Sequence, residues 1–153
     1  PGVPYAPDLA PDYMKMIGSR FVTHPPIQTF RVKVTQPHHP LLVGIDDFTT
    51  EDEPYCCDVT GEIDILLESR YSSETMTELP VGWDDAERVH PQMYLKKVGS
   101  GEILYLMLGH CCGRFDMQPI MAECDVVRCS WDLPVYYELL QRGISWGISG
   151  LTI

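Results

Sequence analysis

The chain has 153 residues and a formal net charge of −11; 44% of the residues are hydrophobic and 22% are charged. This length is sufficient for one domain with a substantial core, and the composition excludes a disordered chain. The excess of acidic side chains repels phosphate groups, which argues against nucleic acid and against an anionic membrane surface as partners. The sequence contains no run of 18 apolar residues, so no membrane span is predicted.

Six cysteines are present, four of them in two Cys-Cys pairs of neighbours. A chain of this size does not need disulfides for stability, so free thiols are favoured, with disulfides and a metal site as alternatives. No signal peptide is visible, and we expect a cytoplasmic protein, with secretion as the alternative. The chain opens on Pro1 rather than Met, which leaves open a processed form or a piece of a longer protein.

The N-terminal part is predicted to be an extended arm followed by a helix and a strand. Residues 1–12 hold four prolines and form the arm, and residues 13–153 form the domain. A short helix is predicted from Pro11 to Ile17, because proline is tolerated in a first helical turn and Gly18 can end the helix. Apolar and basic residues alternate between Thr29 and Val34, which predicts a half-buried strand.

The rest of the chain predicts further strands and a C-terminal helix. Strands are expected at 62–69, 79–83 and 102–108, whereas residues 84–94 show no clear period. The unbroken apolar run of the last strand favours burial on both faces, as in a parallel or mixed α/β sheet. Residues 111–130 are expected to be irregular. A helix is predicted from Leu133 to Ile148, because Asp132 can cap it and apolar residues recur at i, i+4 spacing.

Five short blocks follow one another along the chain: "IGSRFVTHPP", "FRVKVTQPHHPLLVGIDDFTTEDEPY", "LPVGW", "GSGEILYLMLGH" and "SWDLPVYYELLQRGISWGI". Together they span about residues 15–149, and in this order they resemble the ThuA-like (trehalose utilisation) family. The resemblance implies a flavodoxin-like α/β fold, related to class I glutamine amidotransferases, in which a mixed sheet is flanked by helices. The N-terminal βαβ part of that fold has no counterpart here, so the chain matches the C-terminal portion of the family.

The resemblance does not imply glutaminase activity. The amidotransferase relatives use a cysteine nucleophile on a strand-to-helix elbow, which would lie in the part without a counterpart. None of the six cysteines occurs in such a setting.

Three residues are the candidate catalytic groups: His24, Glu53 and His110. His110 follows Gly109 at the end of a predicted strand, where open α/β sheets bind ligands, and histidine transfers protons near neutral pH. His24 lies in "THPP", where two prolines fix the loop, and Glu53 matches the glutamate of the family's "DE.Y" pattern. Carboxylates bind sugar hydroxyls and aromatic rings stack on sugar faces. The candidates for substrate binding are therefore Asp52, Tyr55, Trp83, Gly109 and Trp131.

The cofactor is unknown from the sequence, and a divalent metal such as zinc is the candidate. Zinc prefers four nitrogen and sulfur ligands, often cysteines a few residues apart. His110, Cys112, Cys124 and Cys129 could supply such a set. A Cys124–Cys129 or a Cys111–Cys124 disulfide is the alternative for these thiols.

The sequence leaves three functions open. The first is acid–base chemistry on a carbohydrate of the trehalose or keto-sugar type, by a hydrolase- or isomerase-type enzyme; the resemblance supplies this substrate class. The second is a non-catalytic sugar-binding or protein-interaction module. The third is a structural domain stabilised by zinc or disulfides. A truncated sheet would expose an edge, so a homo-oligomer or a partner chain that completes the sheet is expected.

Overall fold

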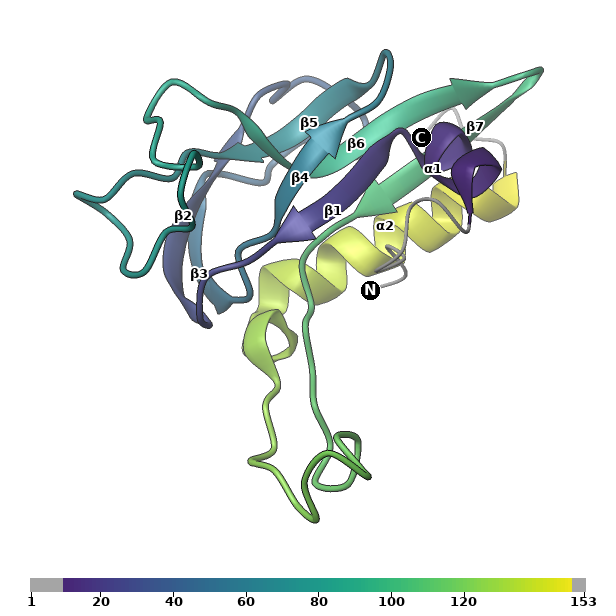
Figure 1. Ribbon diagram of the computed structural model, residues 1–153. Coiled ribbons are helices and arrows are strands. Elements are labelled where there is room, and N and C mark those ends of the chain that lie inside the picture. The colour runs from purple at the N-terminus through teal and green to yellow at the C-terminus, as the bar shows by residue number, and fades with distance from the viewer. Residues whose placement is uncertain (1–9, 150–153) are drawn as a thin grey trace.

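The computed structural model describes residues 10–149, which form two sheets and two α-helices. Five strands make one sheet in the order β3-β2-β5-β6-β7, and β1 pairs with β4 in a second sheet (Figure 1). The strands are β1 (Ser19–Thr23), β2 (Gln28–Val34), β3 (Phe48–Asp52), β4 (Cys56–Val59), β5 (Asp64–Ser69), β6 (His90–Val98) and β7 (Gly101–Leu106). The helices are α1 (Pro11–Ile17), the 3-10 helix η2 (Cys129–Asp132) and α2 (Pro134–Ser149).

The expected flavodoxin-like fold, a mixed sheet flanked by helices, is wrong. Every strand pair within residues 10–149 is antiparallel. Parallel strands need a long crossover, usually a helix, and no α-helix lies between consecutive strands from β1 to β7. The apolar run of β7 was misleading because it does not reveal the direction of the neighbouring strand. β7 pairs with β6 through a tight turn at Gly99 and Ser100, and its residues are at most half-buried.

Several elements agree with the sequence. α1 begins at Pro11 and ends at Ile17, and Gly18 follows it with a left-handed φ of 83°. β2 alternates as predicted, with Phe30 and Val32 buried between exposed residues. The helix predicted at 133–148 is α2. Of the predicted N-terminal arm, residues 1–9 lie outside the described part of the chain, and the end of the arm belongs to α1.

Other elements differ from the prediction. Residues 79–83 are turns rather than a strand, and the apparently aperiodic stretch after them enters β6. β6 was not predicted because its first six residues, from His90 to Leu95, are all buried. A strand buried on both faces shows no alternation, and Pro91 argues against a central strand. The short strand β1 was also not predicted, and residues 49–59, which hold most of β3 and all of β4, were expected to be an acidic loop or a short strand.

The five-stranded sheet is curled so that its two edge strands approach each other. β3 and β7 are at opposite ends of the strand order. Nevertheless Asp52, the last residue of β3, accepts hydrogen bonds from the backbone N–H groups of Gly109 and His110, just beyond β7. The sheet is therefore a half-barrel. Its inside is filled by a core that includes Val32, Leu66, Leu67, Met93, Tyr136 and Leu139, the last two from α2.

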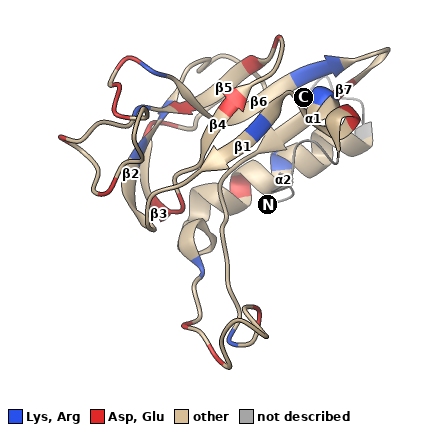
Figure 2. Ribbon diagram, in the orientation of Figure 1, with Lys and Arg blue, Asp and Glu red and all other residues tan. Residues whose placement is uncertain are grey.

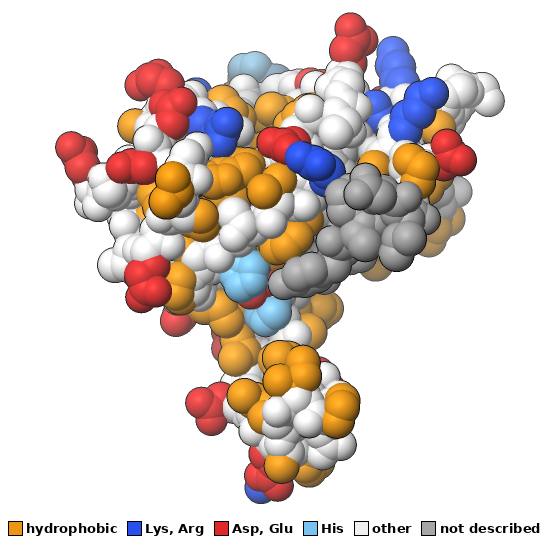
Figure 3. Space-filling view, viewed as in Figure 1, with side chains coloured by type: hydrophobic (Ala, Val, Ile, Leu, Met, Phe, Trp, Pro, Cys, Tyr) orange, Lys and Arg blue, Asp and Glu red, His pale blue; other side chains and the backbone are white. Residues whose placement is uncertain are grey.

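Residues 111–128, here named the protruding loop, project away from the body of the protein (Figure 1). Figure 3 shows that hydrophobic side chains cover much of its tip. These exposed side chains are Phe115, Met117, Ile120, Met121 and Val126. Acidic residues are spread over many loops, and basic ones occur on β1 and β6 (Figure 2). Within residues 10–149, no helix is both long enough and apolar enough to cross a membrane.

Candidate functional site

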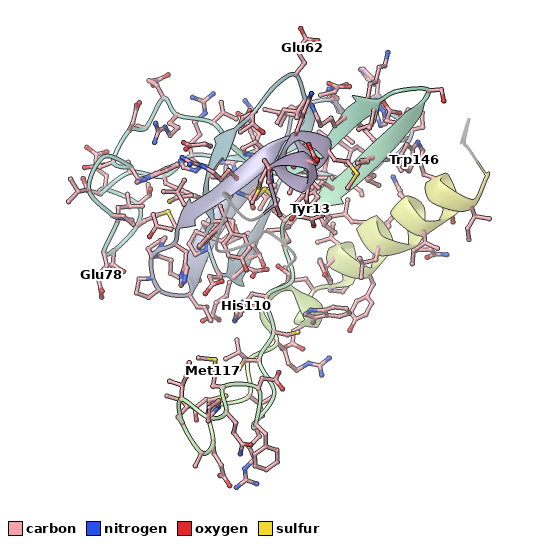
Figure 4. All side chains as sticks on the ribbon, turned by 45° about the vertical axis from the view of Figure 1, so that its right-hand side comes forward. Tyr13, Glu62, Glu78, His110, Met117 and Trp146 are labelled. Carbon is pink, nitrogen blue, oxygen red and sulfur yellow. The ribbon has the colours of Figure 1, made fainter. Side chains whose placement is uncertain are left out.

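Glu53 joins the two predicted catalytic histidines. Its Oε1 lies 3.2 Å from Nδ1 of His24, and its Oε2 lies 3.2 Å from Nδ1 of His110. The three residues come from separate strand ends: His24 follows β1, Glu53 follows β3, and His110 comes after β7. Figure 3 shows two histidine side chains beside an acidic one at the junction of the body and the protruding loop, and Figure 4 labels His110 there.

The contacts at Nδ1 determine the tautomer of each imidazole. Nδ1 of His24 also lies 2.9 Å from the carbonyl oxygen of Pro25. A carbonyl oxygen only accepts hydrogen bonds, so this nitrogen carries the proton. The ionised carboxylate of Glu53 is likewise an acceptor and selects the Nδ1–H form of His110. In both neutral imidazoles the lone pair is then on Nε2, which is the atom able to take a proton from a ligand.

Glu53 is the most enclosed member of this group. Its side chain is 13% exposed, against 35% for His24 and 23% for His110. The carboxylate is thus placed behind two imidazoles that reach the surface. This geometry leaves the histidines to meet a ligand and Glu53 to orient them.

Asp52 fixes the backbone on which His110 is carried. The carboxylate is buried, and it accepts hydrogen bonds from the N–H groups of Glu53 at 2.8 Å, Gly109 at 2.7 Å and His110 at 3.0 Å. The hydroxyl of Ser130 donates a further hydrogen bond to it. A buried carboxylate is tolerated when such donors replace water. Asp52 therefore holds the ends of β3, β7 and η2 together, and its role is positioning rather than contact with solvent.

Gly109 provides a close approach that only glycine allows. Its φ is +98°, and a Cβ built there would lie 2.0 Å from the hydroxyl oxygen of Tyr136. The carbonyl oxygen of Gly109 accepts a hydrogen bond from Nε1 of Trp131 at 3.0 Å. The Trp131 ring packs against that of Tyr136, with centroids 5.0 Å apart. Trp131 therefore borders the site and stabilises the turn that carries His110.

Tyr55 closes the site on the side of β4. Its ring meets those of Phe21 and His24 edge-on, at centroid distances of 5.5 Å and 6.4 Å. Burial, the charge of Glu53 and a hydrogen bond with that carboxylate raise the pKa of the Tyr55 phenol far above its ordinary value. The phenol consequently stays protonated and acts as a donor to Glu53. Tyr55 is thus a third group that orients this carboxylate.

The comparisons with known proteins are consistent with the resemblance found in the sequence. The ThuA family, described as trehalose utilisation, matches residues 4–124. The chain belongs to the ThuA family. Its fold resembles the crystal structure of a ThuA-like protein from Parabacteroides merdae, with a TM-score of 0.62 and 22% identity; the match covers 89% of this chain and 43% of that one. This chain thus spans less than half the length of that protein. No curated protein matches the sequence.

The predicted zinc ligands of this ThuA-family chain do not come together. Cys112 and Cys124 lie close to each other in the protruding loop, with their sulfur atoms 3.2 Å apart. Cys129 is in η2 instead, where burial and the neighbouring Asp52 raise the pKa of its thiol to about 12. The imidazole of His110 faces Glu53. Among the described residues, no group of three or more His, Cys, Asp or Glu side chains is arranged to hold a metal ion.

Trp83 belongs to a different environment from the other predicted site residues. It is buried, its ring lies 5.8 Å from that of His90, and the guanidinium of Arg88 lies over it at 4.2 Å. These contacts are typical of a core tryptophan. Sequence reasoning could not separate this tryptophan from Trp131, because each simply follows a turn or loop.

Two site residues of the ThuA-family chain were missed. Ser130 is buried, and its hydroxyl bonds both Asp52 and the hydroxyl of Thr50, the latter at 2.7 Å. Thr50 is itself buried in β3. The alternation of β3 could have revealed Thr50 and Asp52 as inward-facing residues. Ser130 lies in an irregular segment and gives no such signal.

Proposed function

We propose that His24, Glu53 and His110 carry out acid–base chemistry on a carbohydrate or on its oxidised, keto derivative. The observation that carries the proposal is the placement of one carboxylate 3.2 Å from both imidazoles. The description of the ThuA family, trehalose utilisation, supports this substrate class. This chain spans 43% of the solved ThuA-like protein. The activity of a longer protein that contains this chain is therefore likewise a proposal.

In the proposed mechanism, one histidine is the base and the other, in its protonated form, is the acid. The base takes a proton from the substrate at Nε2, and the acid returns one from Nε2 to a second position. One imidazole is positively charged before the transfer, and the other is positively charged after it. Glu53 contacts both rings, so its negative charge stabilises both states. The pair ends with its roles exchanged and with no net change in protons. This symmetry suits an isomerisation better than a hydrolysis.

We propose a narrower role for four of the remaining candidates. Tyr55 meets the ring of His24 edge-on, and Trp131 binds the backbone of Gly109 next to His110; both are proposed to contact the sugar through ring edges. Asp52 and Gly109 are proposed to position His110. The proposed steps do not use a divalent metal. A second copy or a partner chain at the exposed sheet edges stays a prediction.

The test is solvent deuterium exchange into a keto derivative of trehalose, followed by NMR. We expect the chain to incorporate deuterium at a carbon next to the carbonyl. His24→Gln and His110→Gln should each slow this exchange by about 10²–10⁴-fold. Calorimetric binding of the same sugar should change much less. Sugar binding by the unaltered protein without any exchange would instead indicate the non-catalytic binding module.

A further inference from the structure

Cys112 and Cys124 face each other across the base of the protruding loop, with their sulfur atoms 3.2 Å apart. The backbone imposes this approach. Cys112 and Val127 exchange two hydrogen bonds, of 3.0 Å and 2.9 Å, and the N–H of Cys124 donates to the carbonyl oxygen of Arg114 at 2.9 Å. Hydrogen bonds between the backbones of the two segments therefore hold the two cysteines close to each other. Both side chains are only partly buried, so small reagents can reach them.

The distance between the sulfur atoms fits a thiol pair and not a shared metal ion. Two thiolates on one tetrahedral zinc ion, with bonds of about 2.3 Å, would lie about 3.8 Å apart. A disulfide needs about 2.05 Å, so an inward movement of roughly 1 Å suffices. The hydrogen bond with Cys124 raises the pKa of the Cys112 thiol to about 11, which is consistent with one proton held between the two sulfur atoms.

We propose that Cys112 and Cys124 form a reversible dithiol–disulfide pair that is oxidised by a small-molecule disulfide. One thiolate attacks a sulfur of the reagent R–S–S–R, and a mixed disulfide forms while R–S⁻ leaves. The other protein thiolate then attacks the cysteine sulfur of the mixed disulfide and releases the second R–S⁻. In total the protein loses two protons and two electrons, and the reagent is reduced to two thiols.

The other cysteines are less suited to this reaction. Cys56 is buried in β4, and Cys57 follows it in the same strand, where successive side chains point to opposite faces. Cys129 is turned toward Asp52. Cys111 is exposed, but its neighbour Cys112 is the residue placed against Cys124. The oxidised pair would fix the loop between His110 and η2, whatever reaction the site performs.

For the test, the native, full chain is equilibrated with buffers of oxidised and reduced glutathione. The remaining thiols are then blocked by alkylation, and the tryptic peptides are mapped without reduction. Trypsin places the relevant cysteines in separate peptides, 98–114, 115–128 and 129–142. We expect a loss of two of the six thiols and a covalent link between peptides 98–114 and 115–128. The link should disappear on addition of reduced glutathione.

Three serine variants identify the partners. Cys111→Ser is the matched control, since it removes the adjacent cysteine, and it should keep the link. Cys112→Ser and Cys124→Ser should each abolish the link and leave the remaining thiol mixed with glutathione. Loss of the link in Cys111→Ser, a dominant link to peptide 129–142, or no link in the unaltered protein would overturn the proposal. So would stoichiometric zinc that is lost from either Cys112→Ser or Cys124→Ser.

Discussion

Gly109 and Tyr136 are in direct contact: the hydroxyl of Tyr136 occupies the space where a Cβ of residue 109 would lie, 2.0 Å away. Tyr136 comes from α2, and Gly109 directly precedes His110. Because Gly109 has no side chain, Tyr136 packs directly against the backbone beside His110. The helix therefore helps to set the position of this proposed catalytic residue.

Gly109→Ala is expected to destabilise the protein by about 2 kcal/mol or more, because alanine is strained at the φ of +98° found here and its Cβ would clash with Tyr136. Urea denaturation measures the change in the free energy of unfolding. The control is Gly147→Ala in α2, where nothing lies within 4 Å of the built Cβ. It should be neutral or stabilising by up to about 1 kcal/mol. Equal stability of the two variants would contradict the contact.

Glu53→Gln is expected to release the imidazole of His110 from the Nδ1–H tautomer, because an amide can turn its NH₂ group toward a ring nitrogen. His24 should keep this tautomer, since its Nδ1 also meets the carbonyl oxygen of Pro25. Nitrogen-15 NMR of the histidine side chains reports the tautomers without any substrate. Deuterium exchange into the keto sugar should slow by about 10²-fold or more. Glu51→Gln, at an exposed position in β3 two residues before Glu53, should leave both measurements unchanged. An unaltered His110 signal in Glu53→Gln would show that the carboxylate does not orient this ring.

Asp52→Asn should cost about 2–4 kcal/mol of stability, because an amide offers one acceptor and brings a donor against buried N–H groups. Ser130→Ala removes one hydroxyl from the same carboxylate and should cost about 1–2 kcal/mol. The two effects should not add, since the residues share one hydrogen bond. Chemical denaturation of both single variants and of the double variant gives the coupling, and strict additivity would argue against the bond.

Stability is expected to fall in acid partly because of His90. Burial, helped by the nearby Arg88 charge, lowers the pKa of His90 to about 4, below the ordinary value of 6.5. The unfolded chain therefore binds the proton first. The contribution of His90 is fully present above about pH 6.5, decreases as the pH falls toward about 4, and amounts to roughly 3 kcal/mol.

The variant His90→Phe tests this expectation, because a phenylalanine ring can keep the stacking on Tyr71, whose centroid is 3.9 Å away. The slope of stability against pH between 4 and 6.5 should flatten in this variant. His38→Gln, at an exposed position, is the control and should keep the slope of the unaltered protein. A steep slope that survives in His90→Phe would assign the acid sensitivity to other groups.

The three residues predicted to be catalytic lie together in the structure, whereas the predicted fold was wrong. Short blocks that resemble a family pointed to His24, Glu53 and His110. Each of these residues comes after the end of a strand, and this position does not depend on the direction of the strand. Strand direction depends on contacts between distant segments, which a local apolar pattern does not contain. β6 was hidden by complete burial, and Ser130 by the irregular segment around it. The pairing of Cys112 with Cys124 required the backbone pairing inside the protruding loop.

Both ends of the protruding loop are fastened to one carboxylate, since Asp52 binds the backbone at Gly109 and His110 on one side and the hydroxyl of Ser130 on the other. The distance between these anchor points is set by the body and does not depend on the chain between them. The loop is therefore a natural insertion point, where residues can be added, removed or exchanged for another segment while the two histidines keep their places.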